Sequence, residues 1–199
     1  MKVIVLLFDH FETLDAFGPV EILGRLPDHF QISYYSLEGG IKSSTQGVAI
    51  STQKLTTFDG KVDILLIPGG IGTRTEVNNQ DLIDLIAELS CQSKYTLTVC
   101  TGSALLAKTK LLDGKTATSN KRAINWVVSN RKEVKWKMKA RWTVDGKYYT
   151  SSGISAGMDM TLGFIHDILG FDVAEKIAME MEYVWNSNPD NDRFADFQE

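Results

Sequence analysis

Cysteine is scarce in this sequence, and so are long hydrophobic runs. The chain has two cysteines among 199 residues. Their lack of regular spacing excludes a disulfide framework and favours free thiols in a reducing compartment. No stretch approaches the roughly 20 apolar residues of a membrane-spanning helix. The apolar segment 2–8 ends at Asp9 without a signal-peptide cleavage site, so we expect a buried strand there and a soluble, cytoplasmic protein without a membrane partner.

An excess of positive charge is also lacking. The formal net charge is -4, and the basic residues are scattered except in segment 132–141. There they alternate with apolar residues, which indicates a strand with one solvated basic face that includes Arg141. Nucleic-acid binding needs a basic patch, so we expect no nucleic-acid partner. A small neutral or weakly polar molecule is the expected ligand.

Short apolar runs and helical patterns alternate along most of the chain. The runs are rich in Val, Ile and Leu and are bounded by turn residues, which is typical of strands buried on both faces. We expect strands at 3–8, 31–37, 62–67 and 95–99. We expect helices at 14–26, 81–89, 156–169 and 172–183. This alternation predicts an α/β sandwich whose mainly parallel central sheet is flanked by helices on both faces.

Two parts of the chain depart from that alternation. In segment 141–151, alternating residues flank Asp145-Gly146, which is a strong signal for a hairpin with a two-residue turn. Segment 186–199 has no periodicity and is rich in Asn and Asp. We therefore expect one α/β domain at 1–185 and an irregular or loosely ordered tail at 186–199.

Cys100 has the sequence context of a nucleophile. It follows the apolar run 95–99 and precedes the helical pattern 104–108, which is the setting of a sharp strand-to-helix turn, or nucleophile elbow. Gly102 would let the backbone pass closely, and the helix N-terminus would stabilise negative charge on the sulfur. The alternative is a small buried core residue, the usual fate of a free cysteine. Cys91 lacks such an elbow and is expected to be a passive thiol.

Two more features are expected at the same edge of the sheet. Segment 68–72, Pro-Gly-Gly-Ile-Gly, closes a predicted strand, and its glycines would let backbone N–H groups approach a ligand as an oxyanion hole. The alternative is a glycine-rich turn without a ligand. Asp15 follows the first strand at the start of a helix, where an acid needs no function. Ligands of open parallel sheets bind beyond the carboxyl ends of the strands, which is where Cys100 and Gly70 are expected.

Taken together, these motifs resemble the ThiJ/PfpI superfamily, which has the class I glutamine amidotransferase-like fold with flavodoxin-like topology. Within it, the sequence is most similar to the isocyanide hydratase branch. The resemblance extends from Val3 to Tyr183. It is carried by segments 14–19, 67–70, 99–103, 111–114, 145–146 and 155–159.

The resemblance implies roles for particular residues. Cys100 would be the catalytic nucleophile, and Asp15 the acid that shares a proton with it or with the bound intermediate. Thr101 would act beside them, its N–H and that of Gly70 stabilising charge opposite the sulfur. The remaining binding residues would be Gly69, Gly102, Asn120 and Ile154. The resemblance further implies a homodimer with no metal and no organic cofactor.

Two departures from the family pattern bear on the activity. The protease and amidase branch places a His directly after the nucleophile, whereas this chain has Thr101, which disfavours a Cys-His protease. The hydratase branch carries a His-Trp pair after the strand that follows the elbow helix, whereas this chain has Asn120-Lys121. That change alters the pocket wall and bears on the substrate. The three histidines match no motif and are expected to be surface or capping residues.

The sequence favours a cysteine-dependent small-molecule hydratase or hydrolase. Hydration of an isocyanide to an N-substituted formamide is the first candidate, because an adjacent acid and no His suit thiolate addition followed by hydrolysis of a thioimidate. Three alternatives stay open. Cys100 could be a redox sensor in a stress protein, since an exposed thiol of low pKa is easily oxidised. The chain could instead be a protease-like amidase, or a ligand-sensing module like relatives fused to helix-turn-helix regulators.

Overall fold

The computed structural model of the protein describes residues 1–58 and 60–196. The strands are β1 (Lys2–Leu6), β2 (Gln31–Ser36), β3 (Gly40–Ser43), β4 (Ala49–Lys54), β5 (Ile64–Ile67), β6 (Tyr95–Thr98), β7 (Thr116–Ala117), β8 (Lys135–Trp136), β9 (Trp142–Asp145) and β10 (Tyr148–Ser151). The α-helices are α1 (Thr13–Gly24), α2 (Thr73–Glu76), α3 (Gln80–Gln92), α4 (Gly102–Lys108), α5 (Ile124–Asn130), α6 (Ala156–Leu169) and α7 (Phe171–Glu180).

The main sheet has the order β3-β4-β2-β1-β5-β6-β10-β9 in the described part of the chain. Within this order, each pair of neighbouring strands from β4 to β10 is parallel. The pairs β3–β4 and β9–β10, at the two edges of the sheet, are antiparallel. This is the mainly parallel, flavodoxin-like sheet that the sequence predicts, and that prediction is confirmed.

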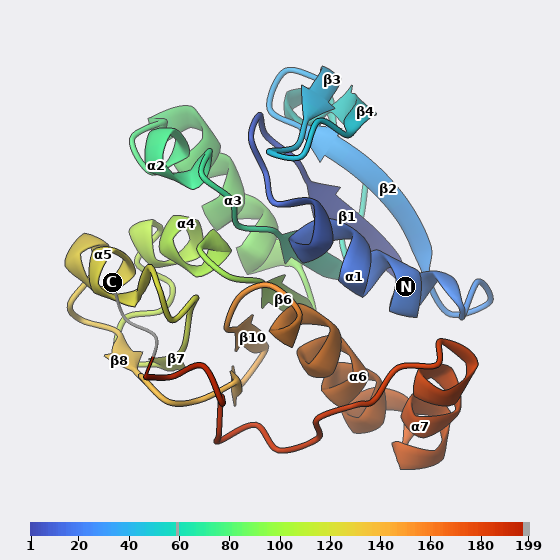
Figure 1. Ribbon diagram of the computed structural model, residues 1–199. Helices are drawn as coiled ribbons and strands as arrows, with labels where there is room; N and C mark the ends of the chain where they lie inside the picture. The colour runs from blue at the N-terminus through green and yellow to red at the C-terminus, as the bar shows by residue number, and fades with distance from the viewer. Residues whose placement is uncertain (59, 197–199) are drawn as a thin grey trace.

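The central strands are apolar because helices cover both faces of the sheet. All four residues of β5 are buried, as are the last four of β1. Helices α1 and α6 form one packed pair, and α3 and α4 form a second packed pair against the sheet (Figure 1). Among the described residues, no helix combines the length and apolarity needed to cross a bilayer. The carboxyl ends of β1, β5 and β6 meet at one edge, and this arrangement positions the candidate site.

The two edge hairpins differ from the sequence predictions. Strands β9 and β10 form the expected hairpin, but Asp145 pairs with Tyr148, so the two-residue turn is Gly146-Lys147 and lies one residue later than predicted. Gly146 has a φ of 63°, a conformation that a glycine adopts without strain. The hairpin of β3 and β4 was not predicted from the sequence. Its residues are mostly polar and exposed, so they lack the apolar signal of a buried strand.

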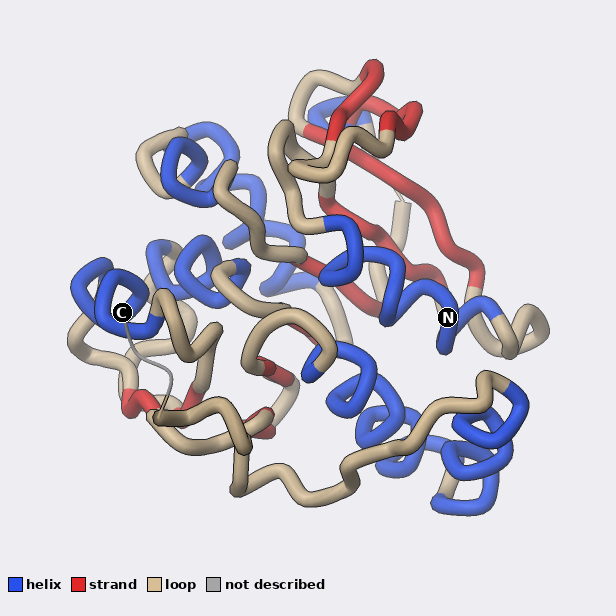
Figure 2. The backbone as a smooth tube through the Cα atoms, in the orientation of Figure 1, coloured by secondary structure: helices blue, strands red, loops and turns tan. Residues whose placement is uncertain are grey.

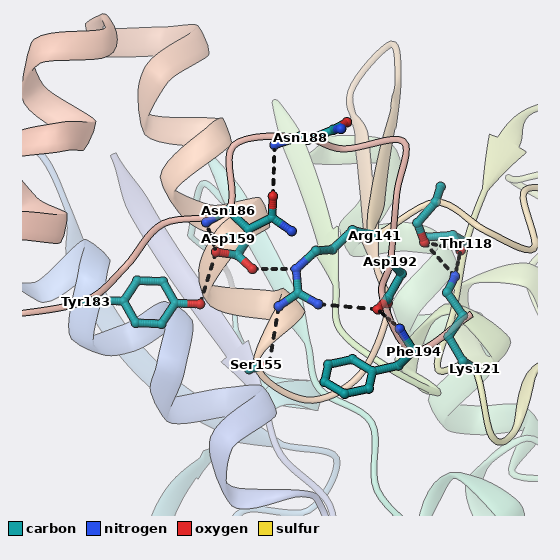
Figure 3. Close-up of polar contacts among 11 residues, drawn as sticks. Thr118, Lys121, Arg141, Ser155, Asp159, Tyr183, Asn186, Asn188, Asp192 and Phe194 are labelled. Atoms are coloured by element: carbon teal, nitrogen blue, oxygen red, sulfur yellow. Dashed lines mark hydrogen bonds and ion pairs between the residues drawn. The ribbon is translucent and has the colours of Figure 1, made fainter. Parts of the chain in front are cut away.

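The predicted basic strand at 132–141 is wrong in two respects. Only β8, which has two residues, is a strand within it. Arg141 is buried instead of belonging to a solvated face. Its Nε lies 2.5 Å from Asp159 Oδ2, and its Nη1 lies 3.5 Å from Asp192 Oδ1 (Figure 3). Two carboxylates from distant parts of the chain hold this cation inside the protein, and periodicity does not reveal such pairing.

The tail is irregular up to residue 196 but makes specific contacts with the domain. It leaves α7 and extends across the molecule toward β7 and β8 (Figures 1 and 2). The carbonyl of Pro189 accepts a hydrogen bond from the N–H of Arg141 at 2.7 Å, and Asp192 is buried against the same arginine. The part of the predicted tail at 197–199 lies outside the described residues. A polar segment was expected to be loosely ordered, whereas Pro189 and Asp192 fix the tail to Arg141 through specific contacts.

Candidate active site

Cys100 lies in a strained turn between β6 and α4. Its φ is 57°, in the left-handed region that residues other than glycine rarely adopt. Such a conformation costs about 1–3 kcal/mol and persists only where surrounding contacts fix it. Its N–H donates to the carbonyls of Ser151 and Ser152 at 3.2 and 3.3 Å, and its carbonyl accepts from the hydroxyls of Ser103 and Ser119 at 3.1 and 2.7 Å. These bonds hold the elbow from two neighbouring segments.

Two glycines make room around the elbow. A Cβ atom on Gly102 would lie 2.4 Å from the carbonyl oxygen of Ile67, so the close backbone passage expected from the sequence requires glycine here. A Cβ atom on Gly153 would lie 2.9 Å from the Cys100 sulfur and 2.1 Å from Asn120 Nδ2. Gly153 therefore lets the Asn120 amide and the thiol approach its backbone closely. Gly153 is not among the site residues predicted from the sequence, although its place directly after the predicted hairpin was a usable signal.

Asp15 is fully buried in the first turn of α1. Its Oδ2 accepts a hydrogen bond from the N–H of Gly69 at 3.0 Å, while Oδ1 receives none from a nitrogen or oxygen of the described chain. Burial raises the pKa of Asp15 well above its ordinary value, and the Gly69 N–H only partly opposes this. The negative charge of Glu12 raises the pKa further. The environment therefore favours a protonated carboxylic acid whose proton is available to a neighbour.

Cys100 and Asp15 form an electrostatically coupled pair. The cysteine is only 6% exposed, and burial raises the pKa of its thiol well above the ordinary value. The charge of Asp15 raises it further, whereas hydrogen bonds from the Thr101 backbone and hydroxyl act in the opposite direction. The exposed thiol of low pKa that the redox-sensor hypothesis needs is therefore not present. Removal from water outweighs the favourable field at the start of the short helix α4.

Thr101 joins the elbow to the loop after β5. Its Oγ1 accepts hydrogen bonds from the N–H of Gly70 at 3.1 Å and from the hydroxyl of Thr73 at 3.0 Å. The Gly70 N–H, expected to face bound negative charge, is thus engaged within the protein. Gly69 and Gly70 instead hold the side chains of Asp15 and Thr101 in place. Thr73 could not be predicted from the sequence, because nothing in the local pattern marks its contact with the elbow.

A cavity of about 210 Å³ lies beside the elbow. Asn120 and Ile154, both expected in the site, line it. The other lining residues are Lys121, Arg122, Ser152, Gly153 and Phe194. The structure thus brings Asn120, Ile154 and Gly153 together near Cys100 and adds a residue of the tail. A larger cavity of about 730 Å³ lies between the tail and β9, and none of the expected site residues lines it.

Lys121 does not extend the site in the way that its pairing with Asn120 suggested. Its Nζ donates to Thr118 Oγ1 at 2.8 Å and to the Ala140 carbonyl at 2.5 Å (Figure 3). Burial lowers the pKa of Lys121 to about 8. The amino group therefore has a structural role beneath the tail, whereas the Asn120 amide nitrogen faces Gly153 and the thiol.

The three histidines are all exposed, as expected. Among the described residues, no group of three or more His, Cys, Asp or Glu side chains has a geometry that could hold a metal ion.

The two thiols are expected to differ in their response to reagent size. The sequence predicts Cys100 as the more reactive, but Cys91 is exposed and Cys100 is buried. A polyethylene-glycol maleimide should therefore label Cys91 and leave Cys100 unmodified in the folded protein, while iodoacetamide should reach both. Peptide mass spectrometry after timed quenching measures this. Labelling of Cys100 by the bulky maleimide at a rate equal to that of Cys91 would contradict the buried position.

Together, the sheet and this pair define an α/β protein with a cysteine on an elbow after a central strand and a buried carboxylic acid beside it. Residues 1–167 match the DJ-1/PfpI family, and the chain belongs to that family. The resemblance inferred from the sequence is confirmed.

The relatives of this chain are named for different functions. The isonitrile (isocyanide) hydratase of Pseudomonas putida is 29% identical over 182 residues, covering 89% of this chain and 76% of that protein. The HTH-type transcriptional regulator GbdR of Pseudomonas aeruginosa is 28% identical over 169 residues, covering 80% of this chain but 44% of the regulator. A crystal structure of a ThiJ/PfpI family protein from Pseudomonas syringae has a TM-score of 0.83 and 25% identity, covering 92% of this chain and 74% of that one.

Proposed function

We propose that the protein is a cysteine-dependent hydratase of isocyanides that produces N-substituted formamides. The observation that carries the proposal is the pairing of a buried thiol, Cys100, with a buried carboxylic acid, Asp15, whose environment favours its protonated form. The similarity to an isonitrile hydratase supports the same reaction. The resemblance of this chain to its family supports a homodimer as the assembly.

In the first step, the sulfur of Cys100 attacks the terminal carbon of the isocyanide. That carbon gains both a bond to sulfur and a proton, so the thiol adds across it and yields a thioimidate. Asp15 delivers its proton to the carbon as it receives the proton of the thiol. A protonated acid is therefore the useful form at the start, and burial of Asp15 supplies it.

In the second step, water adds to the thioimidate carbon and the nitrogen takes up a proton. The resulting tetrahedral species breaks its carbon–sulfur bond, which releases the formamide and returns a proton to the sulfur. Asp15 moves the protons in both steps. In sum, one isocyanide and one water give one N-substituted formamide, and Cys100 and Asp15 return to their starting states.

A peptidase reaction is disfavoured by the residues around the thiol. Thr101 follows the nucleophile, and its hydroxyl is engaged with Gly70 and Thr73. Activation of the sulfur by an imidazole would need a histidine beside it, and no histidine of the described chain is among the groups that affect the pKa of Cys100.

A ligand-binding role without turnover is the second candidate. It is favoured by the similarity to a transcriptional regulator, which shows that a related domain occurs in a protein named for regulation. The two candidates differ in what Cys100 contributes. Turnover requires its thiol, whereas reversible binding in the cavity beside Ile154 does not.

The deciding experiment is a substrate panel with two matched variants. An alkyl isocyanide, an α-oxoaldehyde, a simple amide and a fluorogenic peptide are incubated with wild type, Cys100→Ala and Cys91→Ala, and products are followed by NMR or fluorescence. We expect formamide from the isocyanide with wild type and Cys91→Ala, and none with Cys100→Ala. No release of formamide by wild type would reject the hydratase. Peptide cleavage that is lost in Cys100→Ala would establish a protease instead.

A further inference from the structure

Arg74 lies in the short helix α2, directly after the loop that holds the elbow. Its neighbour Thr73 donates a hydrogen bond to Thr101 Oγ1 at 3.0 Å, and Thr101 follows the nucleophile. Arg74 is therefore linked to the thiol through two residues of fixed geometry. Neither the sequence motifs nor the proposed reaction assigns it a role.

The guanidinium of Arg74 is oriented by an aromatic side chain and has unused hydrogen-bonding capacity. Its Cζ lies 3.4 Å from the ring centroid of Trp126, on α5, so the planar group stacks on the indole. Its Nη1 is buried and has no hydrogen-bond partner within the described chain. A buried, unpaired donor on a cation is costly unless something completes its coordination. No carboxylate of the described chain forms an ion pair with it.

The electrostatic surroundings favour an anion near this donor. Burial lowers the pKa of Arg74, and the thiolate charge of Cys100 opposes that shift, so the two groups interact. The acid of the pair, Asp15, is favoured in its neutral form. A negatively charged group on a ligand would therefore meet the positive charge of Arg74 without repulsion from Asp15.

We propose that Arg74 determines substrate specificity by binding a carboxylate on the substrate whose electrophilic carbon Cys100 attacks. The stacked guanidinium presents Nη1 in a fixed orientation, and arginine binds carboxylates through such planar N–H groups. This inference rests on the proposed function for the identity of the reaction, which then has anionic isocyanides as its preferred substrates.

The first test compares two substrates of nearly equal size, 2-isocyanoacetate and 2-isocyanoacetamide. With wild type, kcat/KM should be higher for the carboxylate. In Arg74→Gln it should fall about tenfold or more for the carboxylate, the effect of losing one charge-assisted hydrogen bond, and stay within about twofold for the amide. Arg25→Gln, which changes an exposed arginine at the end of α1, is the control and should alter neither value. Equal losses for both substrates in Arg74→Gln would show that Arg74 acts on the thiol and would overturn the proposal.

The second test does not depend on the hydratase reaction. In a Cys91→Ser background, Cys100 is alkylated with iodoacetate or with iodoacetamide; in both cases a carbon–sulfur bond forms and iodide leaves. The rate ratio of the anionic to the neutral reagent should drop about tenfold in Arg74→Gln and remain unchanged in Arg25→Gln. If Arg74→Gln fails to fold, Trp126→Leu takes its place. This variant removes the stacking partner of Arg74 and should also lower the rate ratio.

The outcomes separate the two proposals. Turnover of neutral isocyanides with no preference for the carboxylate, and an unchanged alkylation ratio, would reject the role of Arg74 and leave the hydratase intact. No turnover with an altered ratio would reject the hydratase and retain the anion site. Failure of both reagents to reach Cys100 would also reject the site, because its ligand must approach the sulfur.

Discussion

Replacing Asp15 with Asn is expected to lower kcat for isocyanide hydration by about 10²- to 10⁴-fold, the usual contribution of a general acid or base. Asn keeps the shape of the side chain and can still accept the hydrogen bond from the Gly69 N–H. It cannot exchange a proton with the Cys100 thiol or with the substrate carbon. Steady-state formamide production by wild type and variant measures the effect.

The same substitution should not destabilise the fold at neutral pH. Burial raises the pKa of Asp15 in the folded protein, so ionisation costs stability at every pH above the unfolded pKa of the carboxyl. Asn removes that cost. The melting temperature of Asp15→Asn should therefore equal or exceed that of wild type near pH 7. The difference should shrink as the pH falls through the unfolded pKa, because below it the wild-type carboxyl is protonated in both states.

Glu12→Gln is the matched control for charge near the site. Glu12 raises the pKa of Asp15 without being proposed to exchange protons, so its variant should retain kcat within a few-fold. Near-wild-type turnover by Asp15→Asn would contradict the mechanism and leave Asp15 as a buried structural acid. A loss of equal size in Glu12→Gln would mean that local charge, and not proton exchange, controls the rate.

Replacing Arg141 with Gln is expected to destabilise the protein by about 3–5 kcal/mol, the usual cost of removing one partner from a buried ion pair. The variant would leave Asp159 and Asp192 without their cation. Asp159 would keep hydrogen bonds from the Tyr183 hydroxyl at 3.0 Å and the Asn186 N–H at 2.9 Å (Figure 3). These cannot neutralise its charge. Urea denaturation followed by fluorescence gives the change in the free energy of unfolding.

The pH dependence of this variant has a definite sign. Burial already raises the pKa of Asp159 against the opposing effect of Arg141, so loss of the arginine should raise it further. The destabilisation should therefore be largest near neutral pH and smaller toward acid pH, where the orphaned carboxyl takes up a proton.

Lys139→Gln is the control for Arg141→Gln, because Lys139 belongs to the same basic segment but is exposed. Its effect should stay within about 0.5 kcal/mol. Asp192→Asn tests the tail side of the network and should destabilise less than Arg141→Gln, since Asp159 keeps its pair. Equal stabilities for Arg141→Gln and Lys139→Gln would show that the buried pairs contribute nothing to stability.

Much of the fold could be predicted because it follows from local pattern. Buried parallel strands carry continuous apolar runs, as in Ile64–Ile67, and α6 begins and ends where its periodicity does. The hairpin of β3 and β4 could not be predicted, because exposed edge strands carry no such runs. The buried state of Arg141 was hidden for a different reason. Its partners lie 18 and 51 residues away in sequence, beyond any local period.

By itself, the sequence determined the elbow. A strand, a cysteine, a glycine two residues later and a helix constrain the backbone locally, and they identified Cys100 and Gly102 without reference to the rest of the chain. Only the tertiary structure decided the chemical state of the site. The raised pKa values of Cys100 and Asp15, the close approach of Asn120 to Gly153 and the unpartnered Nη1 of Arg74 arise from burial and long-range contacts, which exist only once distant segments have packed together.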